Sequence, residues 1–263
     1  MPDSRFSRMS PDYVARKDYE RMTDYVTSQS TVFPGRRDSW RMFDRIVRRY
    51  DLLNRVLSFR LDQLWRRQVA RMLPDRPGLR VLDLATGTGD MLFAIQDEKP
   101  GVGHMMGMDM SAKMLSRGRE KLRERPLHHA VQLVRSDATS IAAADGFFDA
   151  VTMAFGIRNV EQMFTALQET RRVLRPGGRL LILEFSIPRG PFCQVYLFYL
   201  RHVMTRIGGY VSGDAAAYEY LNRTIESFPC SETFCGLMRE AGFHKVRACP
   251  QTLGIATIYS GER

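Results

Sequence analysis

The sequence lacks several features that would assign the protein to a class at once. It has four cysteines in 263 residues, and Cys230 and Cys235 have no second pair or histidine cluster to complete a zinc site. No apolar run approaches the roughly 18 residues that a membrane-spanning helix needs. The N-terminus has no apolar signal core and contains several acidic residues. We therefore expect a cytoplasmic protein with reduced thiols and no bound metal.

Acidic residues are in deficit, with 29 Asp and Glu against 39 Lys and Arg. The net charge of +10 favours an acidic partner, either nucleic acid or an anionic membrane face. A nucleic-acid enzyme would gather basic and aromatic residues in one recognition module. Here the basic residues are dispersed over amphipathic segments, so we expect no nucleic-acid partner.

The chain divides into an arm and one domain. Residues 1–38 mix charged residues with Ser, Thr, Pro and Gly, and Pro34-Gly35 is typical of a break. We expect this stretch to be a flexible N-terminal arm. From position 39, apolar residues recur at helical spacing in two amphipathic segments, which predict a helical cap over 39–76. The domain itself is expected to span 39–263.

Strands and helices alternate after the cap, which predicts a doubly wound α/β fold with right-handed crossovers. The predicted strands cover 80–84, 105–108, 131–134, 148–153, 180–185, 246–249 and 255–259. The last two are joined too closely for a parallel crossover and should be antiparallel. We therefore predict a seven-stranded, mostly parallel sheet with an antiparallel C-terminal strand.

The sharpest local motif is the turn Gly87-Thr88-Gly89, which follows the first strand and opens a helix. Glycines let a ligand approach the backbone, and doubly wound sheets bind nucleosides at this place. A dinucleotide-binding motif has a third glycine at the position that Leu92 occupies here. Asp83 and Asp90 add negative charge, which suits a cationic ligand such as S-adenosylmethionine (SAM) better than a pyrophosphate. We therefore count Asp83, Gly87 and Gly89 as cofactor-binding candidates.

Acidic residues also end the next two strands. Asp109 lies where a carboxylate can accept hydrogen bonds from both ribose hydroxyls. Asp137 ends the third predicted strand, where a side-chain acceptor can hold the adenine amino group. Together with their neighbours Met110 and Ala138, these residues complete a predicted nucleoside site.

Longer motifs give the chain a family resemblance from position 39 to its end. They are Tyr50-Asp51-Leu52-Leu53-Asn54, Leu64-Trp65-Arg66-Arg67, Phe155-Gly156-Ile157-Arg158-Asn159, Arg172-Val173-Leu174-Arg175-Pro176-Gly177-Gly178, Leu183-Glu184-Phe185-Ser186 and Tyr218-Glu219-Tyr220-Leu221. The sequence resembles the ubiquinone/menaquinone biosynthesis C-methyltransferases, a branch of the Rossmann-like class I SAM-dependent methyltransferases. The motif at 155–159 is the most specific of the set.

The resemblance implies SAM as the cofactor, with contacts at Thr88, Asp109, Asp137 and Ala138. Two positions depart from the family's pattern: Thr86 stands where the family has Gly, and Ala154 where it has Ser. The second change removes a hydrogen bond to the cofactor that would be worth about 1 kcal/mol. We expect weaker contact at Ala154 but a working cofactor site.

The resemblance also implies methylation of a ring carbon of a prenylated quinol, foremost demethylmenaquinol to menaquinol. A 2-methoxy-6-polyprenyl-1,4-benzoquinol is the alternative substrate. The ring carbon becomes nucleophilic when a neighbouring hydroxyl loses its proton, so an oxyanion must be stabilised. Arg158 is the candidate for this task because its guanidinium stays charged. Asn159 can orient a hydroxyl, Tyr50 can close the site, and the general base is not identified.

Residues 190–222 form an aromatic insertion whose apolar side chains occupy nearly every helix face. We interpret it as a substrate lid for the prenyl tail that touches the inner face of the plasma membrane. A homodimer interface or an ordinary part of the core explains the same pattern and stays open. A methyltransferase acting on RNA and a non-catalytic scaffold of a quinone-synthesis complex are the remaining functional alternatives.

Overall fold

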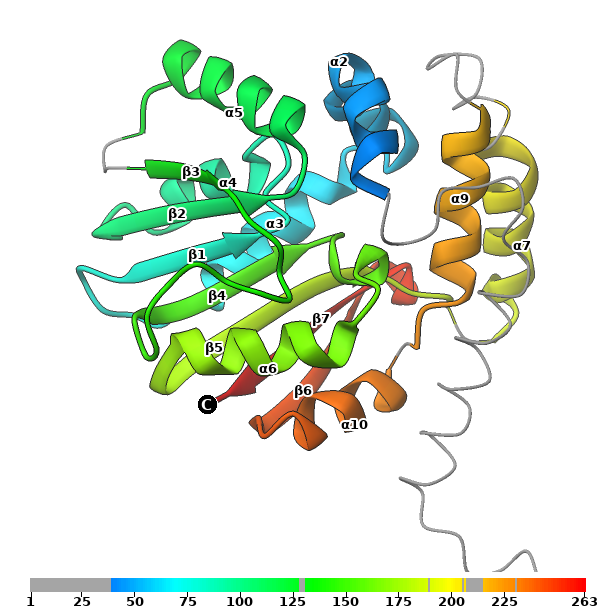
Figure 1. The fold of residues 1–263 in the computed structure, drawn as a ribbon. Coiled ribbons are helices and arrows are strands. Elements are labelled where there is room, and N and C mark those ends of the chain that lie inside the picture. The colour runs from blue at the N-terminus through cyan, green and yellow to red at the C-terminus, as the bar shows by residue number, and fades with distance from the viewer. Residues whose placement is uncertain (1–38, 128–130, 189, 205, 207–214, 230) are drawn as a thin grey trace, which may run out of the picture.

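The computed structural model describes residues 39–127, 131–188, 190–204, 206, 215–229 and 231–263 (Figure 1). The arm expected over 1–38 lies outside these residues. The described part is one α/β body in which helices cover both faces of a central sheet (Figure 1).

The sheet has seven strands in the order β3-β2-β1-β4-β5-β7-β6. Their bounds are β1 Arg80–Leu84, β2 His104–Asp109, β3 Val131–Arg135, β4 Phe148–Ala154, β5 Leu174–Phe185, β6 His244–Gln251 and β7 Ala256–Glu262. Strands β1 to β5 pair in parallel, whereas β7 is antiparallel to both β5 and β6. The order reverses at β1, so the ends of β1 and β4 flank a crevice of the kind that binds ligands in such sheets. The predicted sheet is confirmed, including its antiparallel strand.

The core lies on both faces of this sheet because successive strand residues point to opposite sides. The covering helices are α3 Leu61–Arg71, α4 Asp90–Glu98, α5 Ala112–Glu124, α6 Met163–Val173 and α10 Glu232–Glu240. Leu82 packs with side chains of α6 and α10, while its neighbour Val81 packs with side chains of α3 and α4. Figure 1 shows α6 and α10 on one face and α3, α4 and α5 on the other.

Two details differ from the sequence prediction. The fifth strand was expected over 180–185, but β5 begins at Leu174, includes Pro176-Gly177-Gly178 and shifts its register against β4 there. Gly177 takes the positive φ of 73° that this irregularity requires. The two helices expected to form one cap over 39–76 occupy different places. Helix α3 buries Trp65 in the core beside the sheet, and only the preceding helix lies away from the sheet.

That helix, α2 (Ser39–Leu57), packs against the insertion rather than against the sheet. The insertion forms α7 (Phe192–Phe198), the π-helix η3 (Tyr199–Met204) and α9 (Ala215–Glu226). Tyr196, Leu200 and Tyr220 are buried against Met42 of α2. One face of the insertion is therefore core, while Val195 and Phe198 stay exposed. None of the helices in the described residues is long and apolar enough to cross a membrane.

Candidate active site

A cavity of about 680 Å³ opens at the carboxyl ends of β1, β2 and β4, beneath the start of α2. This volume lies in the usual range for small-molecule sites. Seven of the residues singled out from the sequence line it: Gly87, Asp109, Met110, Asp137, Ala138, Ala154 and Asn159. The structure thus brings the predicted nucleoside site and the loop after β4 into one cavity.

The carboxylate of Asp109 is held in the cavity by two backbone hydrogen bonds. One carboxylate oxygen accepts a hydrogen bond from the Gly87 backbone N–H and the other from that of Ser111, both at 2.8 Å. Burial raises the pKa of Asp109, and the two backbone donors oppose that shift. Because each oxygen can accept more than one hydrogen bond, the carboxylate is oriented by the backbone and still able to bind a ribose.

The glycine turn leaves room for a ligand. Gly87 has φ +58°, and a Cβ there would meet no atom within 4 Å, so the cavity reaches the backbone itself. On the opposite wall, a Cβ on Gly156 would lie 2.5 Å from the Cβ of Ala85. Glycine at 156 therefore allows the loop after β4 to approach the loop after β1 closely. These features fit a nucleoside cofactor bound along the backbone.

Asp137 lies at the far end of the cavity and is exposed. Its Oδ1 accepts hydrogen bonds from the backbone N–H and the hydroxyl of Thr139, both at 2.9 Å. The loop after β3 is thereby fixed where Asp137 and Ala138 line the cavity. At the other end, Ala154 lines the wall and offers no side-chain hydrogen bond, because alanine stands where the family has serine.

Asp83 lies beneath the glycine turn and does not line the cavity. Its side chain is buried, Oδ1 accepts a hydrogen bond from Thr152 at 2.7 Å, and Oδ2 has no hydrogen-bond partner. Burial raises the pKa of Asp83 to about 6, although nearby hydroxyls and the charge of Arg66 oppose the shift. At neutral pH the Asp83 carboxyl is therefore mostly ionised, which places negative charge behind the glycine turn.

Thr88 and Gly89 also lie outside the cavity lining. The Thr88 hydroxyl donates to Asp51 of α2 at 2.6 Å and accepts from Lys121 of α5 at 3.0 Å. Lys121 also pairs with Asp51 and Asp90. Although burial opposes it, the charges of Arg66 and Lys121 hold the pKa of Asp90 below its ordinary value. In this structure Thr88 fastens α2 and α5 to the glycine turn.

Arg158 lies in the 3-10 helix η2 (Ile157–Asn159), behind the cavity wall rather than in it. Its Nη1 donates to Glu184 Oε1 at 2.5 Å and to the Phe155 carbonyl at 2.8 Å. Both side chains of the ion pair are buried. Burial raises the pKa of Glu184, and the charge of Arg158 opposes that shift. The Arg158 Nε is buried and has no hydrogen-bond partner in the described residues.

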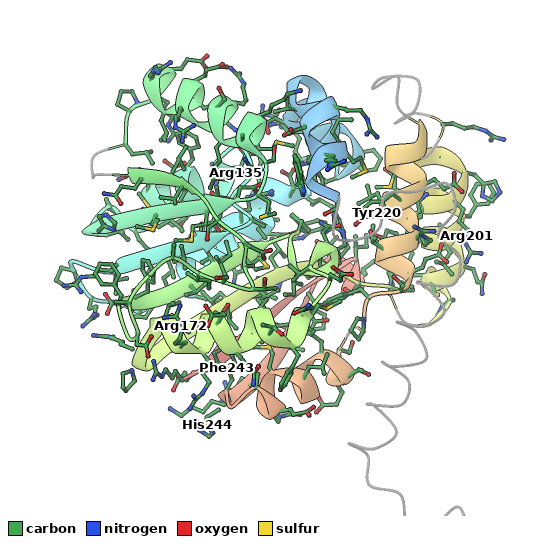
Figure 2. All side chains as sticks on the ribbon, viewed as in Figure 1. Arg135, Arg172, Arg201, Tyr220, Phe243 and His244 are labelled. Carbon is green, nitrogen blue, oxygen red and sulfur yellow. The ribbon has the colours of Figure 1, made fainter. Side chains whose placement is uncertain are left out.

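Asn159 connects this loop to the insertion. Its amide donates to the Phe155 carbonyl at 3.4 Å, and its Oδ1 accepts from the Tyr220 hydroxyl of α9 at 3.3 Å. Figure 2 shows Tyr220 on α9. Tyr50 lies in α2, but its side chain is outside the described residues.

Sequence reasoning missed three residues of this region. Glu184, the partner of Arg158, is a carboxylate inside an otherwise apolar strand, and that placement was the available signal. Trp40 and Phe43 of α2 line the cavity. Helical periodicity placed both on the apolar face of α2 and gave no sign that this face covers a site rather than a core.

The fold defines the class of protein first. Solved structures with the same fold include a SAM-dependent methyltransferase from Thermotoga maritima, at TM-score 0.58 and 19% identity, covering 85% of this chain and 99% of that one. The [4+2]-cyclase SpnF is similar at TM-score 0.58 and 16% identity, with coverage of 89% and 97%. These likenesses show a class I SAM-dependent methyltransferase fold, and the cyclase shows that the fold alone does not fix the reaction.

Sequence similarity then identifies the family. Residues 35–263 match the ubiE/COQ5 methyltransferase family, and the chain belongs to it. A ubiquinone/menaquinone biosynthesis C-methyltransferase UbiE from Syntrophotalea carbinolica is 46% identical over 231 residues, which is 88% of this chain and 95% of that protein. A demethylmenaquinone methyltransferase from Thermus thermophilus is 44% identical over 223 residues, covering 84% of this chain and all of that protein, 100%.

Proposed function

We propose that this protein transfers a methyl group from SAM to a ring carbon of a prenylated quinol, foremost demethylmenaquinol. The observation that supports it most is the continuous cavity, which has the carboxylates of Asp109 and Asp137 at one end and Asn159 of the loop after β4 at the other. Relatives at 44% and 40% identity are named demethylmenaquinone methyltransferases. A methoxy-benzoquinol with a prenyl tail is the second substrate to test.

The residues around the cavity suit SAM. Asp109 would accept hydrogen bonds from the ribose, and Asp137 would accept one from the adenine amino group. Gly87, Met110, Ala138 and Ala154 would contact the cofactor by their backbone or by apolar atoms. Asp83 and Asp90 would favour its positive charge from behind the glycine turn. When bound, SAM supplies an electrophilic methyl group on a sulfonium.

Arg158 and Asn159 would act on the quinol. A ring hydroxyl that loses its proton leaves an oxyanion, and a buried guanidinium stabilises it strongly because water does not screen the charge there. Arg158 lies behind the cavity wall in this structure, so its unpartnered Nε would reach the oxyanion only after the loop after β4 moves. Glu184 would hold the guanidinium in place through the 2.5 Å ion pair. Asn159 would orient the second hydroxyl, and Tyr50 would close the site from α2.

We further propose that the insertion brings the protein to the cytoplasmic face of an anionic membrane. Phe59 and Phe198 are 75% and 60% exposed, and the Phe59 ring lies 6.1 Å from that of Tyr199. Exposed aromatic side chains and a net charge of +10 suit a lipid surface, from which a prenylated quinol must be taken. Sedimentation with anionic vesicles, weakened in Phe59→Ser/Phe198→Ser, tests this contact. Loss of a homodimer in that variant would instead assign the surface to a second copy.

Radiolabelled methyl transfer tests the activity. The purified protein is given labelled SAM with reduced demethylmenaquinol, and in a parallel reaction with the methoxy-benzoquinol. Incorporation into either quinol supports the proposal and identifies the head group. SAM binding without transfer to either quinol would contradict the substrate, and RNA would be tested next. Absence of SAM binding would favour a scaffold role.

A further inference from the structure

We propose that Trp40 closes the cavity over the adenine of the bound nucleoside and contributes directly to cofactor affinity. This inference rests on the proposed SAM site and assigns an aromatic cover to it. Trp40 lies in the first turn of α2 and lines the cavity together with Ser39 and Phe43. It belongs to none of the three core clusters of the described residues, so core packing does not explain it.

The second tryptophan of the chain shows the contrast. Trp65 is 1% exposed, packs in the core beside the sheet, and donates its indole N–H to Thr252 at 2.9 Å. Trp40 is only half-buried. An indole held at a cavity rim, with its ring left partly open, is typical of a ligand contact rather than of a structural anchor.

Arg135 determines which end of the cavity Trp40 covers. The guanidinium carbon of Arg135 lies 5.5 Å from the Trp40 ring centre, and its Nε donates to the Met110 carbonyl at 3.0 Å. Met110 directly follows the ribose candidate Asp109, and Arg135 pairs with Asp109 in the sheet register. Arg135 lies between β3 and α2 in Figure 2. Trp40 is thereby placed above the ends of β2 and β3, where the adenine is expected.

A second link fixes the same register of α2. Asp44, one turn after Trp40, accepts a hydrogen bond from the hydroxyl of Ser111, the residue that caps α5. Asp51, two turns further along α2, binds Thr88 and Lys121. Since α2 is tied at two points to the glycine turn and to α5, the indole is held in position before a ligand arrives. Preorganisation of this kind favours affinity.

The two tryptophans make the test selective. Trp40 is the one that lines the cavity, so adenosine binding should change the fluorescence of the wild type and not that of Trp40→Phe, which retains Trp65. L-methionine carries the other part of the cofactor and should leave the fluorescence unchanged. A methionine-induced change without an adenosine-induced one would place Trp40 at the wrong end and overturn the inference.

Calorimetry with S-adenosylhomocysteine gives the affinity. We expect Trp40→Ala to weaken binding by about tenfold, the usual size of one lost stacking contact on a base, and Trp40→Phe to retain most of the affinity. Phe147→Ala is the matched control, because the Arg80 guanidinium carbon lies 4.9 Å from the Phe147 ring centre. Phe147 precedes the amino end of β4, whereas the cavity lies at the carboxyl ends of the strands. It should bind like the wild type.

The outcomes separate this inference from the proposed function. Wild-type binding with no effect of Trp40→Ala and no adenosine-induced fluorescence change would overturn the role of Trp40 and leave the SAM site intact. A wild type that binds neither compound by calorimetry would contradict the SAM site, and the inference with it. Equal weakening in Trp40→Ala and Phe147→Ala would indicate general destabilisation and would also overturn it.

Discussion

The two ends of the cavity are held by different parts of the chain. At the nucleoside end, Asp109 is oriented by two backbone N–H groups, and both belong to loops that leave the parallel sheet. At the other end, Arg158 is held by the side chain of Glu184, and Asn159 by the hydroxyl of Tyr220 from the insertion.

This difference has consequences for how each end responds to change. Backbone donors keep their positions when one side chain is altered, although the Gly87 and Ser111 N–H groups would lose an acceptor. The nucleoside end should therefore keep its shape and lose mainly the contacts of the mutated residue. Side-chain pairs leave their partner unsatisfied when one member is removed, and a buried partner is then costly. Mutations should therefore separate cofactor binding from turnover. Mutations at the substrate end should also lower the free energy of unfolding more than mutations at the nucleoside end.

The largest effect is expected at Arg158. Arg158→Ala should lower turnover by about a thousandfold, the cost of losing a preorganised donor to an oxyanion, while SAM affinity changes little. It should also lower the free energy of unfolding by about 3–5 kcal/mol, because Glu184 is left buried and unpaired. Methyl-transfer kinetics, calorimetry and denaturant unfolding measure the three quantities.

The double variant Arg158→Met/Glu184→Met separates the two roles of Arg158. Replacing a whole buried ion pair by apolar residues is often neutral for stability, so unfolding should return close to the wild-type value while turnover stays low. Recovered turnover would show that Arg158 acts only through the fold, and the proposed oxyanion contact would be wrong.

The next effect concerns Asp83 and depends on pH. Its pKa is raised from 3.8 to about 6 by burial, so between these values the folded protein binds the proton that the unfolded chain releases. The free energy of unfolding therefore falls as pH rises from about 4 to 6, by about 3 kcal/mol from this group, and changes no further above that window.

Asp83→Asn keeps a hydrogen-bonding side chain and removes this titration. Relative to the wild type, the variant should gain about 3 kcal/mol of unfolding free energy between pH 4 and pH 8. Denaturant unfolding of both proteins at the two pH values measures the difference, in which other acidic groups cancel. Asp75→Asn is the exposed control: Lys99 lowers the pKa of Asp75, so its titration lies below this pH range and the variant should show almost no trend between the two pH values. A pH-independent difference for Asp83→Asn would show that the carboxyl is ionised throughout.

A smaller effect is expected for Asp109→Asn. Charge-assisted hydrogen bonds contribute about 1.5–3 kcal/mol each, and an amide still accepts one of them, so SAM affinity should fall by about thirtyfold. Calorimetry measures it, with Asp137→Asn as the exposed counterpart expected to lose less. Turnover at saturating SAM should stay close to that of the wild type. A selective loss of turnover would contradict the separation of the two ends.

The sheet was predictable from the sequence because its signals are local. A glycine turn or an acidic residue ends or follows each of the first three strands, and parallel strands bring those ends together. Asp109, Asp137 and Gly87 could thus be placed in one site without coordinates. The register shift in β5 was not predictable, since Pro176-Gly177-Gly178 has the composition of an ordinary turn, and only pairing with β4 keeps it in the strand.

The partners of the site residues were not predictable, because they come from distant segments. Nothing local joins Arg158 to Glu184, 26 positions away, or Thr88 to Asp51 and Lys121. Thr88 was expected to touch the cofactor; in this structure its hydroxyl fastens two helices to the glycine turn. Periodicity recognised α2 and α3 as amphipathic but could not assign one to the cavity and the other to the core.

The smallest effect is expected for Tyr220→Phe, which removes one neutral hydrogen bond to Asn159 Oδ1 at 3.3 Å. Such a bond contributes about 0.5–1.5 kcal/mol, so the KM for the quinol should rise by a few fold while SAM affinity is unchanged. Tyr220→Leu, which also loses buried ring contacts with Met42 and its neighbours, should add a loss of stability. If Tyr220→Phe weakened SAM binding as much as it raised the quinol KM, the insertion would act on both ends of the cavity, and the two ends would have to be treated as one unit.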